Sequence, residues 1–127
     1  SNFSFNSLTF CGHPSMSTKY INPVLGRFEP DLDVALHDAD VIMTLRIQYE
    51  RFEETLNLDL EEYKQAYELT SERLEQAKGD AIVMHPGPVN YIEISESVYQ
   101  CDQSVIRTQI ANGVAIRMAV LSRFLSS

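Results

Sequence analysis

The stretch Asp40-Val41-Ile42-Met43-Thr44-Leu45 decides the fold class of this chain, because it is almost continuously apolar and lies between helix-like segments. A second apolar run, Asp80-Ala81-Ile82-Val83-Met84, follows the pair Lys78-Gly79, which is typical of a helix end. Strands with this pattern are buried on both faces, as in parallel sheets. A third strand is expected over Ser7–Cys11, before Gly12. We therefore expect a parallel sheet whose inner strands are covered by helices on both faces.

Helical periodicity fills the segments between these strands. Asp31 is a suitable N-cap for a brief helix, and a second helix is expected over Asp59–Leu69. Thr70 caps a further helix, and Gln103–Leu125 has the apolar spacing of one long amphipathic helix. The chain is thus predicted to be an α/β protein, with three α/β/α layers around a small parallel sheet of about three strands. Residues 1–127 are expected to form a single domain.

Composition narrows the class of protein. The chain has 127 residues, 44% of them hydrophobic, and a formal net charge of −8 at pH 7. This charge argues against nucleic acid or an anionic membrane as partner, since both need a basic surface. There is no apolar run long enough to span a membrane and no signal-peptide pattern, so the sequence predicts a soluble protein. With only Cys11 and Cys101, reduced thiols in a cytoplasmic protein are expected, and a single disulfide is the alternative.

Polar residues follow both apolar runs. Arg46 comes directly after the first, and its planar guanidinium suits a carboxylate. The second is followed by His85-Pro86-Gly87-Pro88-Val89-Asn90, in which two prolines flanking a glycine fix a turn that can approach a ligand closely. Because parallel sheets bind ligands at the carboxyl ends of their strands, the pair predicts a site for a small anionic substrate.

Each candidate residue also has a purely structural interpretation. Arg46 could form a salt bridge with Glu50 or Glu53 at the strand end. His85, at a strand end before a proline, is interpreted as a structural residue rather than a catalytic one. His13 lacks the further ligands that a metal needs, so neither a metal nor a cofactor is expected.

The order of motifs along the chain resembles the C-terminal part of aspartate carbamoyltransferase catalytic chains. Ornithine carbamoyltransferases, which are related, have His-Cys-Leu-Pro where this chain has His85-Pro86-Gly87-Pro88. The resemblance covers nearly the whole chain. It rests on the segments Cys11–Pro14, Ala39–Arg51, His85–Asn90, Ser104–Gln109 and Asn112–Leu121.

This resemblance implies an aspartate-binding domain. The enzymes of the family transfer a carbamoyl group from carbamoyl phosphate to the amino group of L-aspartate in pyrimidine biosynthesis. Carried over, the motifs make Arg46 a cation for a substrate carboxylate and Gln48 an amide contact beside it. They also imply a cis Gly87–Pro88 bond and a Gly87 carbonyl that receives the substrate's amino group. No residue of the chain is assigned a catalytic role. Supporting roles fall to His85, Pro86 and Arg51.

Two departures from the family pattern limit what the chain is expected to do alone. Related chains read Asn-Arg-x-x-Glu-Ile after the proline-rich turn, whereas Asn90-Tyr91-Ile92-Glu93-Ile94 is one residue shorter and has no arginine. The resemblance also implies that the N-terminal carbamoyl phosphate domain lies outside this sequence, so carbamoyl phosphate is expected to reach this chain only through that domain. Because the reaction depends on positioning two substrates, we expect the isolated chain to be inactive and to bind L-aspartate weakly or not at all.

Three functions remain open at this stage. The first is a partial aspartate carbamoyltransferase catalytic chain. The second is a non-catalytic homologue that serves as an interaction or assembly module, and the third is a free-standing amino-acid-binding protein. A homo-oligomer is expected in any case, since apolar positions such as Val114 and Leu121 on the last helix lose their cover without a second domain.

Overall fold

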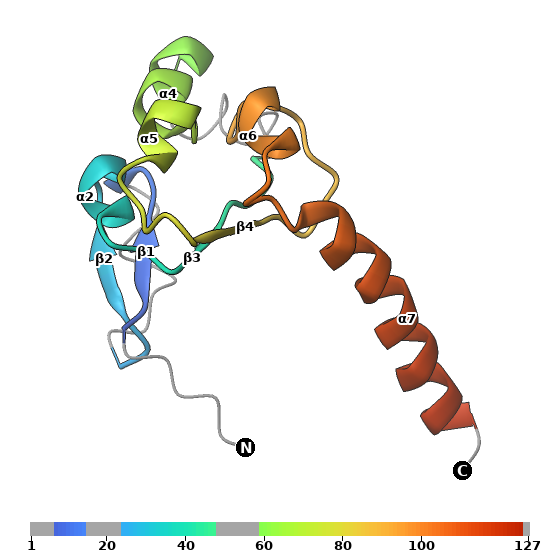
Figure 1. Ribbon diagram of the computed structural model, residues 1–127. Coiled ribbons are helices and arrows are strands. Elements are labelled where there is room, and N and C mark those ends of the chain that lie inside the picture. Colours follow the sequence, from blue (N-terminus) through green and yellow to red (C-terminus); the bar gives the residue numbers. More distant parts are fainter. Residues whose placement is uncertain (1–6, 15–23, 48–58, 126–127) are drawn as a thin grey trace.

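The computed structural model describes residues 7–14, 24–47 and 59–125. Strands and short helices alternate along the chain, and one long helix closes it (Figure 1). This confirms the predicted α/β class. The elements are β1 (Thr9–Cys11), β2 (Arg27–Glu29), α2 (Leu32–Leu36), β3 (Val41–Met43), α4 (Leu60–Tyr67), α5 (Ser71–Leu74), β4 (Ile82–Met84), α6 (Glu96–Gln100) and α7 (Ile106–Leu125).

All strand pairing is parallel, as predicted, but it is divided between two sheets. β1 pairs with β2, and β3 pairs with β4 so that Ile42 lies opposite Val83. The three expected strands are present in shorter form. β2, Arg27–Glu29, was not predicted, because three residues with a charge at each end carry no strand periodicity.

The hydrophobic core lies on one side of β3 and β4. Val83 is completely buried, and α2, α5, α6 and the start of α7 pack around it. In Figure 1, α2, α4, α5 and α6 are gathered on this side of the two strands. Each fully buried aliphatic side chain contributes about 1.5–3 kcal/mol, so this cluster stabilises the fold. Its buried members are Leu36, Leu69, Leu74, Val83, Ile94, Val98 and Ile106.

The opposite face of β3 and β4 is uncovered in the described part of the chain. Val41 is 49% exposed, Met43 52% and Ile82 37%. The prediction that helices cover both faces of these strands is therefore wrong for this face. The apolar pattern correctly predicted two strands, but the described helices cover only one face of them.

Side-chain caps begin three of the helices, at Asp31 and Thr70 as predicted and at Asp59, which was predicted as the first residue of its helix. Asp31 accepts N–H bonds at the start of α2, Asp59 at the start of α4 and Thr70 at the start of α5. The long helix, expected over Gln103–Leu125, is observed as α7. The short helix α6, capped by Ser95, was not predicted.

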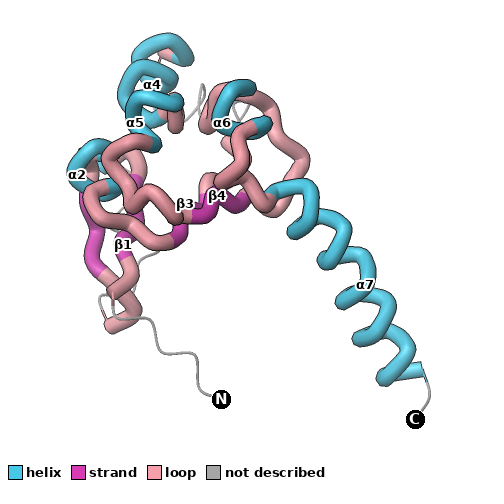
Figure 2. Tube along the Cα trace, in the orientation of Figure 1, coloured by secondary structure: helices cyan, strands magenta, loops and turns pink. Residues whose placement is uncertain are grey.

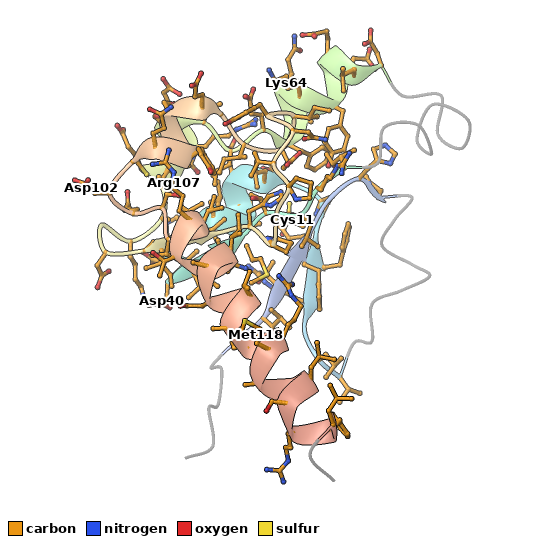
Figure 3. The ribbon with its side chains drawn as sticks, turned by 90° about the vertical axis from the view of Figure 1, so that its right-hand side faces the viewer. Cys11, Asp40, Lys64, Asp102, Arg107 and Met118 are labelled. Atoms are coloured by element: carbon orange, nitrogen blue, oxygen red, sulfur yellow. The ribbon has the colours of Figure 1, made fainter. Side chains whose placement is uncertain are left out.

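Helix α7 extends away from the rest of the molecule after its first turns (Figures 1 and 2). Ile106 at its start is completely buried, whereas Leu121 is 60% exposed and Leu125 83% exposed. Figure 3 labels Met118 on this extended part, far along the helix from Arg107. Among the described residues, no helix is long and apolar enough to cross a membrane.

Candidate substrate-binding site

The loops after β3 and β4 leave the molecule at one edge, because these strands are parallel neighbours. Their pairing continues past the strand ends. The Thr44 N–H donates to the Met84 carbonyl at 3.0 Å, and the Thr44 hydroxyl contacts the same oxygen at 3.3 Å. The segments that carry Arg46 and Gly87 therefore begin side by side, as the sequence predicts.

The turn after β4 is built on His85, which is completely buried. Its Nδ1 accepts a hydrogen bond from the Gly87 N–H at 2.7 Å, and its Nε2 lies 2.8 Å from Oε1 of Glu93. Since Nδ1 accepts, the proton of the neutral ring is assigned to Nε2, which donates to Glu93. The His85 backbone N–H donates to Oε1 of Gln109 on α7 at 2.9 Å. His85 thus links the turn to two other segments and has no exposed atom for acid–base chemistry.

Gly87 occupies a backbone conformation that favours glycine. Its φ angle is +71°, and a Cβ added there would lie 3.1 Å from Cδ1 of Ile110 on α7. The Gly87–Pro88 bond is cis, which confirms what the family resemblance implies. Gly87 is half-buried and Pro88 is exposed. The Gly87 carbonyl accepts no hydrogen bond from the described residues, so this oxygen is available to a ligand.

Arg46 is exposed at the end of the β3 segment, and Ile47 beside it is buried. Arg46 forms no ion pair or hydrogen bond with another described residue. Its guanidinium is therefore free to take a carboxylate in a bidentate pair. The alternative partners Glu50 and Glu53 lie outside the described residues, as do the predicted site residues Gln48 and Arg51.

Glu93 is a buried acceptor whose capacity is only partly used. It is 4% exposed, and its Oε1 takes His85 Nε2 and, at 3.5 Å, the Asn90 N–H. Its Oε2 is buried and has no hydrogen-bond partner among the described residues. The sequence predicts no role for Glu93 or Gln109. Their contacts with His85 span 8 and 24 positions, and no helix or strand periodicity indicates them.

A second group of ionisable residues surrounds the end of β1. Partial burial of the sulfur raises the pKa of Cys11 to about 11, and the carboxylates of Glu29 and Asp31 act in the same direction. Burial also raises the pKa of the Tyr63 phenol, whose ring lies 4.9 Å from that of Tyr67. Both groups stay protonated at neutral pH, so Cys11 is a poor nucleophile.

The described residues contain no group of three or more His, Cys, Asp or Glu side chains placed to hold a metal ion. A shallow hollow of about 430 Å³ is lined mainly by α5 and the residues between α5 and β4. One of its lining residues, Lys78, forms an ion pair in which Nζ lies 2.6 Å from Oδ1 of Asp40. The hollow is lined by Ser71, Leu74, Glu75, Ala77, Lys78, Gly79, Cys101 and Gln103.

Comparison with known sequences gives one consistent result. The family model described as aspartate/ornithine carbamoyltransferase, Asp/Orn binding domain, matches residues 21–124. The chain is 51% identical over 96 residues to the aspartate carbamoyltransferase catalytic subunit of Xanthomonas oryzae, a match that covers 75% of this chain and 30% of that protein. It is 52% identical over 92 residues to the subunit of the same name from Citrifermentans bemidjiense, covering 72% and 30%. The chain thus spans about 30% of the length of these relatives.

Solved structures agree with the sequence comparison. A crystal structure of aspartate transcarbamoylase from Trypanosoma cruzi in complex with carbamoyl phosphate and aspartate matches with a TM-score of 0.63 and 30% identity. The match covers 76% of this chain and 31% of that one. An ornithine carbamoyltransferase from Pyrococcus furiosus matches with a TM-score of 0.66 and 24% identity, covers 76% and 31%, and supports the fold alone.

Proposed function

Because this chain belongs to the aspartate/ornithine carbamoyltransferase family, we propose that it is the aspartate-binding part of an aspartate carbamoyltransferase. The observation that supports this proposal is that neighbouring loops at one edge of the sheet carry a cation and a carbonyl acceptor, each without a partner among the described residues. Arg46 has no described ion-pair partner, and the Gly87 oxygen accepts no described hydrogen bond. L-Aspartate carries carboxylates for the first and an amino group for the second.

In this proposal the chain binds and orients the nucleophile. Arg46 takes a carboxylate of L-aspartate, and the Gly87 carbonyl accepts a hydrogen bond from the amino group that reacts. Pro86 and Pro88 restrict the exposed backbone of the turn on either side of Gly87, while the buried His85 holds it from within. Gln48 and Arg51 keep the contact and supporting roles that the sequence predicts. A bidentate Arg–carboxylate pair in a partly closed site contributes about 1.5–3 kcal/mol.

The reaction needs groups beyond these. The aspartate nitrogen attacks the carbamoyl carbon, the bond from that carbon to the phosphate oxygen breaks, and phosphate leaves while the nitrogen loses a proton. Stabilising the phosphate and the carbonyl oxygen requires donors near carbamoyl phosphate. We assign these donors to a separate carbamoyl phosphate domain, as in the complete enzymes of the family. The 127-residue chain alone is therefore expected to have no carbamoyltransferase activity. The complete enzyme is proposed to act in pyrimidine biosynthesis in the cytoplasm.

A complementation assay tests the proposal. The chain is supplied with carbamoyl phosphate and L-aspartate, first alone and then mixed with the separately expressed N-terminal domain of the Xanthomonas oryzae relative. We expect no turnover alone and measurable turnover in the mixture. Arg46→Ala should lower kcat/KM for L-aspartate in the mixture by about tenfold to a hundredfold, with Arg27→Ala, a substitution of an exposed arginine away from this edge, as matched control. Absence of turnover in the mixture contradicts the proposal.

A non-catalytic assembly module is the second candidate, and the turn after Gly87 is what favours it. Tyr91 occupies a left-handed conformation, φ +57°, in the segment where related chains carry an arginine. Its ring packs edge-on against Tyr99 at 5.9 Å, and Arg107 lies over Tyr99 at 5.3 Å. The turn therefore presents a tyrosine in place of that arginine, next to a ring that Arg107 already covers. Binding of the N-terminal domain without turnover would support this candidate over the enzyme.

Self-association is also part of the proposal. The extended part of α7 exposes an apolar face, and a stable protein interface typically buries about 800 Å² on each partner. Val114 is 49% exposed, Met118 66% and Leu121 60%. We expect light scattering to show a dimer or larger assembly, and Leu121→Glu to shift it towards monomer. A monodisperse monomer of the unaltered chain argues against self-association.

A further inference from the structure

One side chain joins the two loops of the candidate site. Nδ2 of Asn90, in the turn after β4, donates to the carbonyl oxygen of Ile47 at 3.1 Å, across 43 residues of sequence. Ile47 is buried and directly follows Arg46. The bond therefore anchors the carbonyl of the residue that follows the arginine to the opposite loop.

Both polar atoms of the Asn90 side-chain amide form hydrogen bonds. Its Oδ1 accepts the Ile92 N–H at 3.2 Å, which holds the side chain in the turn, while Nδ2 reaches Ile47. An amide offers an acceptor and a donor on one short side chain. A carboxylate offers only acceptors, and it would face the Ile47 carbonyl oxygen across the contact that is now a hydrogen bond.

The backbone ladder does not make this link redundant. The last described bond between the β3 and β4 segments runs from Thr44 to Met84. Arg46 lies two residues further along and has no described bond of its own, so its direction depends on the anchored residue after it. His85 fixes Gly87 on the other side of the site. Beyond the Thr44–Met84 contacts, Asn90 is thus the side chain among the described residues that links the two loops by a hydrogen bond.

We propose that Asn90 is a positioning residue that sets the separation between the Arg46 guanidinium and the Gly87 carbonyl for the bound amino acid. This inference rests on the proposed function. A ligand held at two fixed points is sensitive to their separation, and a displacement of about 1 Å can cost up to a hundredfold in rate. Loss of the Asn90 bond should therefore weaken use of L-aspartate more than it weakens use of carbamoyl phosphate.

The test compares Asn90→Asp with the unaltered chain, and Asn112→Asp on the exposed face of α7 is the matched control. In the complementation mixture, Asn90→Asp should raise KM for L-aspartate at least about tenfold, with KM for carbamoyl phosphate within about twofold. A purely structural role would lower activity without this split. In the chain alone, ¹⁵N relaxation should show greater mobility of the Arg46 and Ile47 amides, with Leu69 and Val83 unchanged.

The outcomes separate the two proposals. If the unaltered chain shows no turnover with the N-terminal domain, the proposed function fails. The relaxation experiment then still decides whether Asn90 orders the Arg46 segment. If the mixture is active and Asn90→Asp changes neither the aspartate KM nor the two amides, the positioning role is overturned. Should Asn90→Asp not fold, Asn90→Ser replaces it, since serine keeps an acceptor for Ile92 but is too short to reach Ile47.

Discussion

The loop after β4 and the loop after β3 supply the same site by opposite means. The first is organised from the interior, with His85 completely buried and bonded at both ring nitrogens and at its backbone N–H. The second presents the exposed Arg46, which no described residue binds. One loop owes its shape to buried polar contacts, and the other keeps a charge in solvent at little structural cost.

This difference has a physical reason. A hydrogen bond gains strength in a buried environment, and a buried group left without a partner costs about 1–3 kcal/mol. A turn held by such bonds is rigid, which suits a carbonyl that must point one way. A guanidinium loses its hydration when it is buried, so it remains exposed until a carboxylate arrives. Stability and ligand binding should therefore respond to different residues.

The largest effect on stability is expected for His85→Ala. The change leaves the Gly87 N–H and Oε1 of Glu93 without the ring and opens a cavity, so we expect a loss of about 3 kcal/mol in the free energy of unfolding. Urea denaturation followed by circular dichroism measures it. His37→Ala, at an exposed histidine, should change stability by less than about 0.5 kcal/mol. Equal effects of the two variants would remove the distinction between the loops.

A smaller effect is expected for Gly87→Ala, because a left-handed φ and a close side chain act together. The left-handed conformation alone costs a residue with a Cβ about 1–2 kcal/mol. Adding Ile110→Val removes the Cδ1 atom that lies 3.1 Å from the new Cβ, so the double variant should recover the steric part of the loss. Thermal denaturation of the single and double variants tests this. A double variant that shows simple additivity would mean that Ile110 does not press on the turn.

The contribution of α7 to the turn is tested by Gln109→Leu. Leucine has a similar volume but no acceptor, so the His85 N–H loses its partner, and a loss of about 1–2 kcal/mol is expected. Thr108→Leu, at the neighbouring exposed position, serves as control and should lie within about 0.5 kcal/mol of the unaltered chain. Hydrogen exchange at the His85 amide gives a direct second measurement. Unchanged exchange in Gln109→Leu would show that this contact does not hold the turn.

The smallest change in stability is expected for Arg46→Ala, within about 0.5 kcal/mol, since the side chain is exposed and has no described partner. The same substitution should have a large effect on the reaction, with a loss of about tenfold to a hundredfold in kcat/KM for L-aspartate in the complementation assay. Arg46→Lys keeps the charge but not the bidentate geometry and should lie between. A marked fall in unfolding free energy for Arg46→Ala would indicate a structural role.

Local features of the fold, such as helix caps and strands, could be predicted from the sequence. Asp31 and Thr70 cap helices where the residue types predict them, because a capping side chain acts within three residues of itself. The apolar runs around Ile42 and Val83 gave two parallel strands, and the proline-rich turn follows the second. The short elements β2 and α6 escaped prediction, since three to five residues carry too little periodicity to be recognised.

By itself, then, the sequence determined the α/β class, the parallel strands, the long last helix and the placing of Arg46 and Gly87 at strand ends. Only the tertiary structure decided which side of β3 and β4 is covered, and that His85, Glu93 and Gln109 meet beneath the turn. It also decided that Asn90 reaches Ile47. Periodicity and capping depend on neighbours in sequence, whereas these contacts join residues up to 43 positions apart and exist only once the strands have paired.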